Sequence, residues 1–291
     1  MNQLYIRSLE ELFKLYNDAC EWFSTLGFSW GITRYGTYKK HFDKFQELAA
    51  SRNDSSFNIE MKNAFDNAYL EANEIIRVYS ALKQLVNSEF YKQLKHVLSG
   101  QEYRGLVDND TARDFLFELS TAARFLQAGY KVKLSGLCDV VVENMEGDIF
   151  IECKRIKSTS KIAKNIKAAS EQINNRLKAN PSKKVLGLVA VNVTDLIQNS
   201  SMLLPDSPQA AMECQQIIAN AFLSKHSENL TPKSRSKRLL GIMIECSSIW
   251  HLSERSPIIG IPYTRHTNFI TLAKSEILEP LGSRICNQDI I

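Results

Sequence analysis

The chain has 291 residues, of which 44% are hydrophobic, and it carries a formal net charge of only +4. This length and composition suffice for a sizeable buried core and are typical of a chain with two structural regions. The longest apolar stretch, near residues 185–191, is too short to span a bilayer, and the first residues lack the pattern of a signal peptide. We therefore expect a cytoplasmic location and no membrane partner.

Missing motifs exclude several other kinds of site. The six cysteines are scattered without a C-x-x-C pair or a nearby histidine, so they indicate neither a zinc site nor a disulfide framework. The glycine-rich motifs G-x-x-x-x-G-K-[ST] and G-x-G-x-x-G, which hold nucleotide phosphates, are also absent. We therefore expect no ATP hydrolysis by this chain alone.

The first hundred residues show helical spacing and few strand signals. Apolar residues recur with this spacing in three stretches, residues 9–26, 38–50 and 57–98. A boundary is indicated near Gly100 and Gly105, before the polar residues 108–110. We predict a helical module over residues 1–105, which recognises substrate, dimerises or receives a partner, and a second domain over residues 106–291.

The next expected element is an amphipathic helix over residues 110–128. Thr111 and Asp114 have the spacing of a capping box at its start, and Gly129 is placed to end it. Glu118 lies at the border of the apolar stripe. From this position its carboxyl can point beyond the packed face toward the strands that follow.

A β-hairpin is expected after a first strand at residues 131–134. It is formed by two apolar, β-branched runs at residues 137–143 and 148–154. Side chains alternate along a strand, so Glu152 and Lys154 share one face. If the hairpin folds about residues 145 and 146, Asp139 lies nearly opposite Glu152. Two carboxylates and an ammonium then meet at one end of the sheet, and a hard divalent cation such as Mg²⁺ would stabilise them.

The stretch from residue 113 to 157 resembles the core of the PD-(D/E)xK nuclease superfamily, which has the restriction-endonuclease-like fold. Its Holliday-junction-resolvase-like and Mrr-like branches are nearest in pattern. These families carry a helix glutamate, an aspartate on the second strand and an acid-x-lysine pair on the third strand. The corresponding residues here are Glu118, Asp139, Glu152 and Lys154. The proline of the superfamily's name is absent before Asp139, where Cys138 stands, and many branches lack it too.

The resemblance implies a metal-dependent active site. Glu118, Asp139 and Glu152 would bind one or two Mg²⁺ ions, with Mn²⁺ as an alternative, and Lys154 would position or activate the attacking water. Some branches add a glutamine or lysine from the next helix, for which Gln172 is the candidate. The implied reaction is metal-assisted hydrolysis of a phosphodiester, with DNA favoured over RNA as substrate.

Basic residues follow the acidic positions. Residues 154–184 hold ten lysines and arginines but a single acid, and a helix in this stretch keeps its cations off the apolar stripe. Such a patch is typical of a surface that follows a phosphate backbone, although an ordinary solvated helix face has the same composition. The candidate nucleic-acid contacts are Arg155, Lys157, Lys161, Lys164 and Lys167. A second basic run at residues 225–238 is expected in a serine-rich loop, which either clamps the substrate or is simply mobile.

The remaining chain predicts alternating strands and helices. Buried strands are expected near residues 184–193 and 238–246, a helix at residues 209–224, and edge strands at residues 258–263 and 268–272. This pattern indicates an α/β fold in which helices flank a central mixed β-sheet, restriction-endonuclease-like in type and preceded by an all-helical N-terminal region.

The leading hypothesis is an Mg²⁺-dependent endodeoxyribonuclease that acts in defence, restriction or repair. One alternative is a subunit of the same fold that binds nucleic acid or supports assembly without cutting. Another is a structural or regulatory partner in which the acids form an ion-pair network. A homodimer or a companion ATPase or helicase is a candidate partner by analogy.

Overall fold

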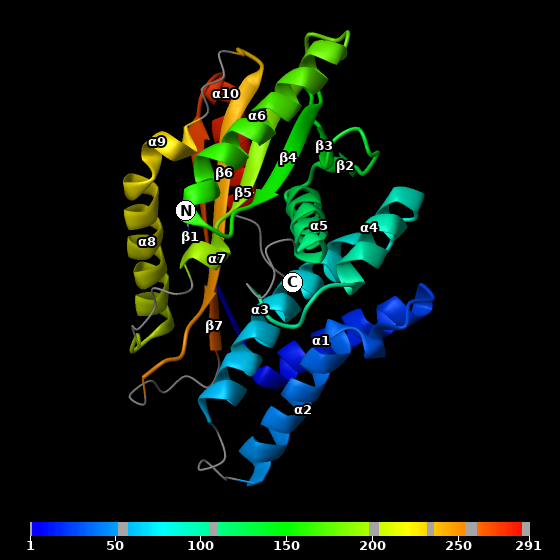
Figure 1. The fold of residues 1–291 in the computed structure, drawn as a ribbon, viewed down its shortest axis with the longest axis vertical. Coiled ribbons are helices and arrows are strands. Elements are labelled where there is room, and N and C mark those ends of the chain that lie inside the picture. Colours follow the sequence, from blue (N-terminus) through cyan, green and yellow to red (C-terminus); the bar gives the residue numbers. More distant parts are fainter. Residues whose placement is uncertain are drawn as a thin grey trace.

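The computed structural model describes residues 2–51, 58–104, 110–197, 204–231, 236–253 and 261–286. Within these residues the centre of the molecule is a seven-stranded sheet in the order β1-β7-β6-β5-β4-β3-β2 (Figure 1). The strands are β1 Asn2–Arg7, β2 Lys131–Lys133, β3 Val140–Glu143, β4 Ile149–Arg155, β5 Leu186–Asn192, β6 Leu239–Ile249 and β7 Ile261–Thr271. Strands β4, β5 and β6 run parallel, and the other neighbours are antiparallel. The fold is therefore α/β with a mixed sheet.

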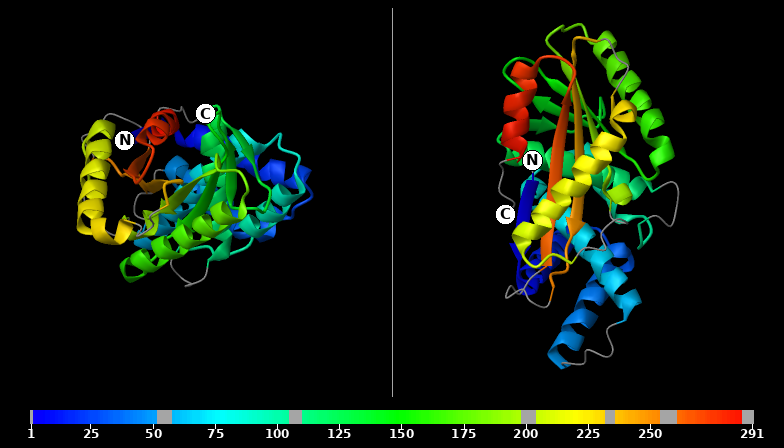
Figure 2. Two further views of the ribbon diagram at one scale, coloured as in Figure 1. Left: turned by 90° about the horizontal axis from the view of Figure 1, so that it is seen from above. Right: turned by 90° about the vertical axis from the view of Figure 1, so that its left-hand side faces the viewer.

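Helices cover both faces of this sheet. They are α1 Leu9–Thr25, α2 Arg34–Ser51, α3 Ile59–Leu82, α4 Ser88–Leu98, α5 Thr111–Gln127, α6 Ile162–Ala179, α7 Thr194–Ile197, α8 Pro208–Lys225, α9 Ser227–Leu230 and α10 Ser275–Cys286, with 3-10 turns η1 Trp30–Ile32 and η3 Thr159–Lys161. Helices α1 to α5 and α10 share a core with one face, and α6, α8 and α9 share a core with the other. Figure 2 shows α6 and α10 on opposite sides of the strands. None of the described helices combines the length and apolar character that a membrane crossing requires.

Strand β4 shows how the alternating sequence sets the two faces. Ile151 and Cys153 are buried in the core that contains α5, whereas Phe150 is buried in the core that contains α6. Because side chains alternate, Glu152 and Lys154 are directed to the α6 face of the sheet. The predicted division of this strand is confirmed.

The β3–β4 hairpin has the predicted register. Val140 pairs with Ile151, and the turn contains Gly147 with a φ of +137°. A Cβ at this position would lie 2.0 Å from the carbonyl oxygen of Lys184. Only glycine suits both the backbone conformation and this close approach.

We expect Gly147→Ala to lower the free energy of unfolding by about 1–3 kcal/mol, because the backbone would be strained and the neighbouring chain displaced. Urea unfolding measures the change. Gly31→Ala is the matched control, since a Cβ there meets no atom within 4 Å, and it should change stability by less than about 0.5 kcal/mol. Equal stability of the two variants would contradict the close approach.

The structure corrects two expectations about the sheet. Residues 2–7 lie in a region that we expected to be all-helical, but they form the edge strand β1, whose register pairs Asn2 with His266. The two short edge strands expected at residues 258–263 and 268–272 are one strand, β7, which lies between β6 and β1. Strand β1 was not predicted because its partner lies far away in the chain, and β7 was predicted as two strands because its buried middle, residues 264–267, is polar. Residues 258–260 are outside the described part of the chain.

The start of α5 differs slightly from the expected capping box. Asp110, rather than Thr111, is the N-cap, and its side chain accepts a hydrogen bond from the Arg113 N–H. Gly129 follows the helix with a φ of +86°, as its position predicted. The proposed domain boundary near Gly105 lies outside the described residues and stays a prediction.

Candidate active site

Asp139 lies immediately before β3, and its carboxylate reaches the backbone of β4. Continuing the pairing of Val140 with Ile151 by one residue places Asp139 opposite Glu152. Asp139 Oδ2 accepts a hydrogen bond of 2.7 Å from the Cys153 N–H. The carboxylate is therefore anchored at the peptide link between Glu152 and Cys153.

Glu152 is the most buried of the three predicted acids, with a side chain only 2% exposed. Its Oε1 lies 3.0 Å from Lys154 Nζ, and its Oε2 contacts the guanidinium of Arg176 on α6. A buried carboxylate is costly without such partners. Two cations from separate elements therefore compensate this one acid.

Glu118 lies on α5, which packs against the face of β4 opposite to α6. Burial, followed by the negative charge of Asp139, raises the pKa of Glu118 to about 8, while Lys154 opposes the shift. Burial also raises the pKa of Asp139, although the Cys153 N–H and Lys154 favour its ionised form. Charge on Glu118 is thus unfavourable beside Asp139, and a cation near both carboxyls would stabilise their ionised forms.

The raised pKa of Glu118 has a measurable consequence for stability. Between about pH 4.5 and pH 8 the folded state keeps a proton that the unfolded state releases, so this carboxyl lowers stability as pH rises. We expect Glu118→Gln to remove this loss and to gain stability over wild type from pH 5 to pH 8, by on the order of 1–3 kcal/mol.

Urea unfolding of both proteins at pH 5, 6.5 and 8 tests this expectation. Glu47→Gln, at an exposed position of α2, is the control and should show no such trend. A difference between Glu118→Gln and wild type that stays constant over this range would contradict the burial of Glu118 beside Asp139.

Gln172 lies at an exposed position of α6, and its catalytic role stays a prediction. Arg176, one turn later on the same helix, makes the contact with Glu152. Helix side chains lean toward the N-terminus, so the long side chain of Arg176 extends back to the level of Glu152.

The predicted nucleic-acid contacts divide into two groups. Arg155 is corrected: its side chain is 3% exposed and pairs with Asp114 at 3.3 Å and with Asp195 at 2.5 Å. It therefore cannot serve as an exposed phosphate contact. Lys157 is half-buried, and burial lowers its pKa. Exposed cations along η3 and α6 are Lys161, Lys164 and Lys167.

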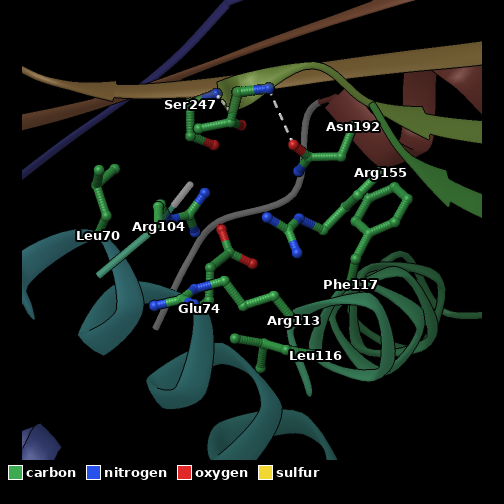
Figure 3. Close-up of a pocket in the computed structure, with 10 residues that line it drawn as sticks. Leu70, Glu74, Arg104, Arg113, Leu116, Phe117, Arg155, Asn192 and Ser247 are labelled. Atoms are coloured by element: carbon green, nitrogen blue, oxygen red, sulfur yellow. Dashed lines mark hydrogen bonds between the residues drawn. The ribbon is translucent and has the colours of Figure 1, made fainter. Parts of the chain in front are cut away.

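A polar cavity lies at the carboxyl ends of β4, β5 and β6, between the sheet and helices α3 and α5 (Figure 3). Arg104, Arg113 and Arg155 line it. Glu71, fully buried on α3, lies 2.8 Å from both Arg104 and Arg113. Asp195 joins Arg104 to Arg155. We call these five residues the arginine network; it connects the N-terminal helices to the strand that carries Glu152 and Lys154.

The acids, Lys154 and Arg176 form an electrostatically coupled group, which we call the candidate site. In the part of the chain that the structure describes, no three His, Cys, Asp or Glu side chains are grouped so that they could hold a metal ion. The backbone brings Asp139 and Glu152 opposite each other, and metal ligation by Glu118, Asp139 and Glu152 stays a prediction.

Comparisons with known proteins do not identify the chain. No family model, no curated protein and no solved structure matches it significantly. The function must therefore be argued from the residues of the candidate site and their surroundings.

Proposed function

We propose that the protein is a metal-dependent nuclease of the PD-(D/E)xK type that hydrolyses phosphodiester bonds of DNA. The observation that carries this proposal is the anchoring of Asp139 at the β4 backbone, opposite Glu152 and beside Lys154. The order of elements supports it, because α5 is followed by β2, β3, β4, α6 and β5, and these four strands are neighbours in the sheet. This order is the one expected for a restriction-endonuclease-like core.

The donors of the candidate site fit a hard divalent cation. Mg²⁺ is commonly held by one or two carboxylates and keeps several waters, so Asp139 and Glu152 are a sufficient protein ligand set. The raised pKa values of Asp139 and Glu118 are consistent with this fit, since a cation would favour the ionised forms of both carboxyls. Mn²⁺ accepts the same oxygen donors.

The mechanism assigns a separate task to each side chain. When bound, the metal would supply Lewis-acid polarisation of the phosphoryl oxygen and a water of lowered pKa. Asp139 and Glu152 would hold the ion, and Glu118 would accept a hydrogen bond from its water shell. Lys154, which is 26% exposed beside Glu152, would orient the attacking water and offset the negative charge that develops on the phosphate.

The exposed lysines of α6 would hold the nucleic acid. We expect the double variant Lys164→Glu/Lys167→Glu to weaken DNA binding and to reduce the slope of log K against log salt by roughly 2, about 0.9 for each lost phosphate contact. Fluorescence anisotropy with duplex DNA at several salt concentrations measures both effects. Lys14→Glu/Lys44→Glu makes the same charge change at exposed positions of α1 and α2 and should affect binding less.

Incubation with supercoiled plasmid, linear plasmid and RNA in the presence of Mg²⁺, Mn²⁺ or EDTA tests the activity. We expect nicking of supercoiled DNA with either metal and no nicking with EDTA. If the protein cleaves none of these nucleic acids with either metal, the proposed nuclease activity is contradicted.

The second candidate function is a nucleic-acid-binding or assembly subunit without catalysis. It is favoured by the ion pairs of Glu152, because both carboxylate oxygens already have cationic partners. Salt-dependent DNA binding without metal-dependent cleavage would select this alternative.

A further inference from the structure

We propose that Arg176 is a mobile cation that holds Glu152 in the metal-free protein and transfers to a phosphate of the substrate when the metal binds. The inference rests on the proposed nuclease function and adds a residue that the resemblance to the nuclease superfamily did not include. Its basis is the contact between the Arg176 guanidinium and Glu152 Oε2.

Each carboxylate oxygen of Glu152 already contacts a cationic group. Lys154 lies at Oε1 and Arg176 at Oε2, and the Glu152 side chain is 2% exposed. A divalent ion bound there would also stand close to both cationic groups. Withdrawal of one of the two cations would relieve this repulsion.

Arg176 is the cation that can leave. Glu152 and Lys154 are two residues apart on one strand, so the backbone keeps them on the same face of the sheet. Arg176 comes from a separate helix, reaches the carboxylate with a long side chain and is 27% exposed. Rotation about its side-chain bonds can withdraw the guanidinium without any change in the sheet.

A phosphate is the natural new partner for the released guanidinium. Arginine presents a planar set of donors that matches two phosphate oxygens, and it remains charged at any working pH. The same helix carries the exposed lysines Lys164 and Lys167, so a nucleic acid held along α6 would pass near Arg176. Metal binding and substrate contact are thus linked through one side chain.

Isothermal titration calorimetry with Mg²⁺ alone tests the first step, in which Arg176 leaves Glu152 as the metal binds. Arg176→Gln keeps a polar side chain beside Glu152 but removes the competing charge, so we expect it to bind Mg²⁺ about tenfold more tightly than wild type. Arg176→Lys should bind Mg²⁺ with nearly wild-type affinity. Lys178→Ala, at an exposed position two residues further along α6, should leave affinity unchanged.

Plasmid cleavage at saturating Mg²⁺ tests the second half. Arg176→Gln should cleave at least about a hundredfold more slowly despite its tighter metal binding, as expected when a group that stabilises transition-state charge is lost. Circular dichroism confirms folding, and Arg176→Lys provides a second variant that should also cleave slowly, because it lacks the planar donor set.

The outcomes distinguish this inference from the nuclease function itself. Suppose that the wild-type protein binds Mg²⁺ and cleaves DNA. The role of Arg176 alone would then be overturned if Arg176→Gln bound Mg²⁺ no more tightly than wild type, or if it cleaved at the wild-type rate. Wild-type protein that neither binds Mg²⁺ nor cleaves would overturn both proposals.

Discussion

Replacing Asp139 by asparagine is expected to abolish metal-dependent cleavage while the fold is kept. The amide oxygen can still accept the 2.7 Å hydrogen bond from the Cys153 N–H, so the end of the hairpin stays anchored. The charge that would hold the metal is lost, and a deficit of about 4 kcal/mol in transition-state stabilisation corresponds to a rate roughly 10³-fold lower. Initial rates of plasmid nicking at saturating Mg²⁺ measure the loss, and urea unfolding checks the fold.

Two further variants define what this experiment shows. Lys154→Ala should reduce the rate by about 10²–10⁴-fold, the range found when a group that assists proton transfer is removed. Glu143→Gln is the matched control. Glu143 is also an acid of the hairpin, at the end of β3, but it pairs with Lys133 at the surface. It should cleave at the wild-type rate. Wild-type cleavage by the Asp139→Asn variant would show that this carboxylate does not bind the metal.

The largest expected effect on stability comes from Glu71→Gln in the arginine network. Burial alone would raise the pKa of Glu71, but Arg113, Arg104 and Arg34 outweigh it and hold the pKa well below its usual range. Replacing this carboxylate would remove the counter-charge that three largely buried guanidinium groups share. The loss of one partner from such a buried pair typically lowers the free energy of unfolding by about 3–5 kcal/mol, and we expect a loss of that size.

The pH dependence follows from the direction of this shift. A carboxyl whose folded pKa is depressed contributes stability above its unfolded pKa, near 4.5, and this contribution is lost as pH falls toward the folded value. The difference between wild type and Glu71→Gln should therefore be full at pH 7 and should shrink below about pH 4. Urea unfolding over this range measures it.

Asp43→Asn is the control for the Glu71 experiment, because it removes an acid from an exposed ion pair with Lys39 on α2. Exposed pairs of this kind contribute about 0–1 kcal/mol. A similar loss in Glu71→Gln and Asp43→Asn would mean that Glu71 does not stabilise the arginine network.

The parts of the fold that the sequence predicted are those fixed by short-range patterns. The apolar stripe of α5, the β-branched runs of β3 and β4, and the turn between them all lie within about 45 residues of one another. Alternation along β4 fixed which residues share a face, and the turn fixed the register. The position of Asp139 opposite Glu152 followed from these two facts alone.

The missed features depend on contacts between distant residues. Arg155 sits in a basic stretch and looked exposed, yet its partners Asp114 and Asp195 come from about 40 residues before and after it. Arg176 was overlooked because a single sequence does not show how far a helix extends beside its strand. The sequence did not predict the arginine network either, because its members lie on separate segments from α3 to α7.

The pairing of β1 with β7 has a consequence for the order of folding. Strand β1 pairs with residues 261–266 of β7, and helices α1 to α5 separate it in the chain from the next strand of the sheet. During synthesis, β1 therefore cannot pair until residues 261–266 have left the ribosome, because contacts so distant in sequence form late. Pairing of β1 with β7 should be a late step of folding, and truncation before residue 261 would leave strand β6 at an open edge that could pair with other chains.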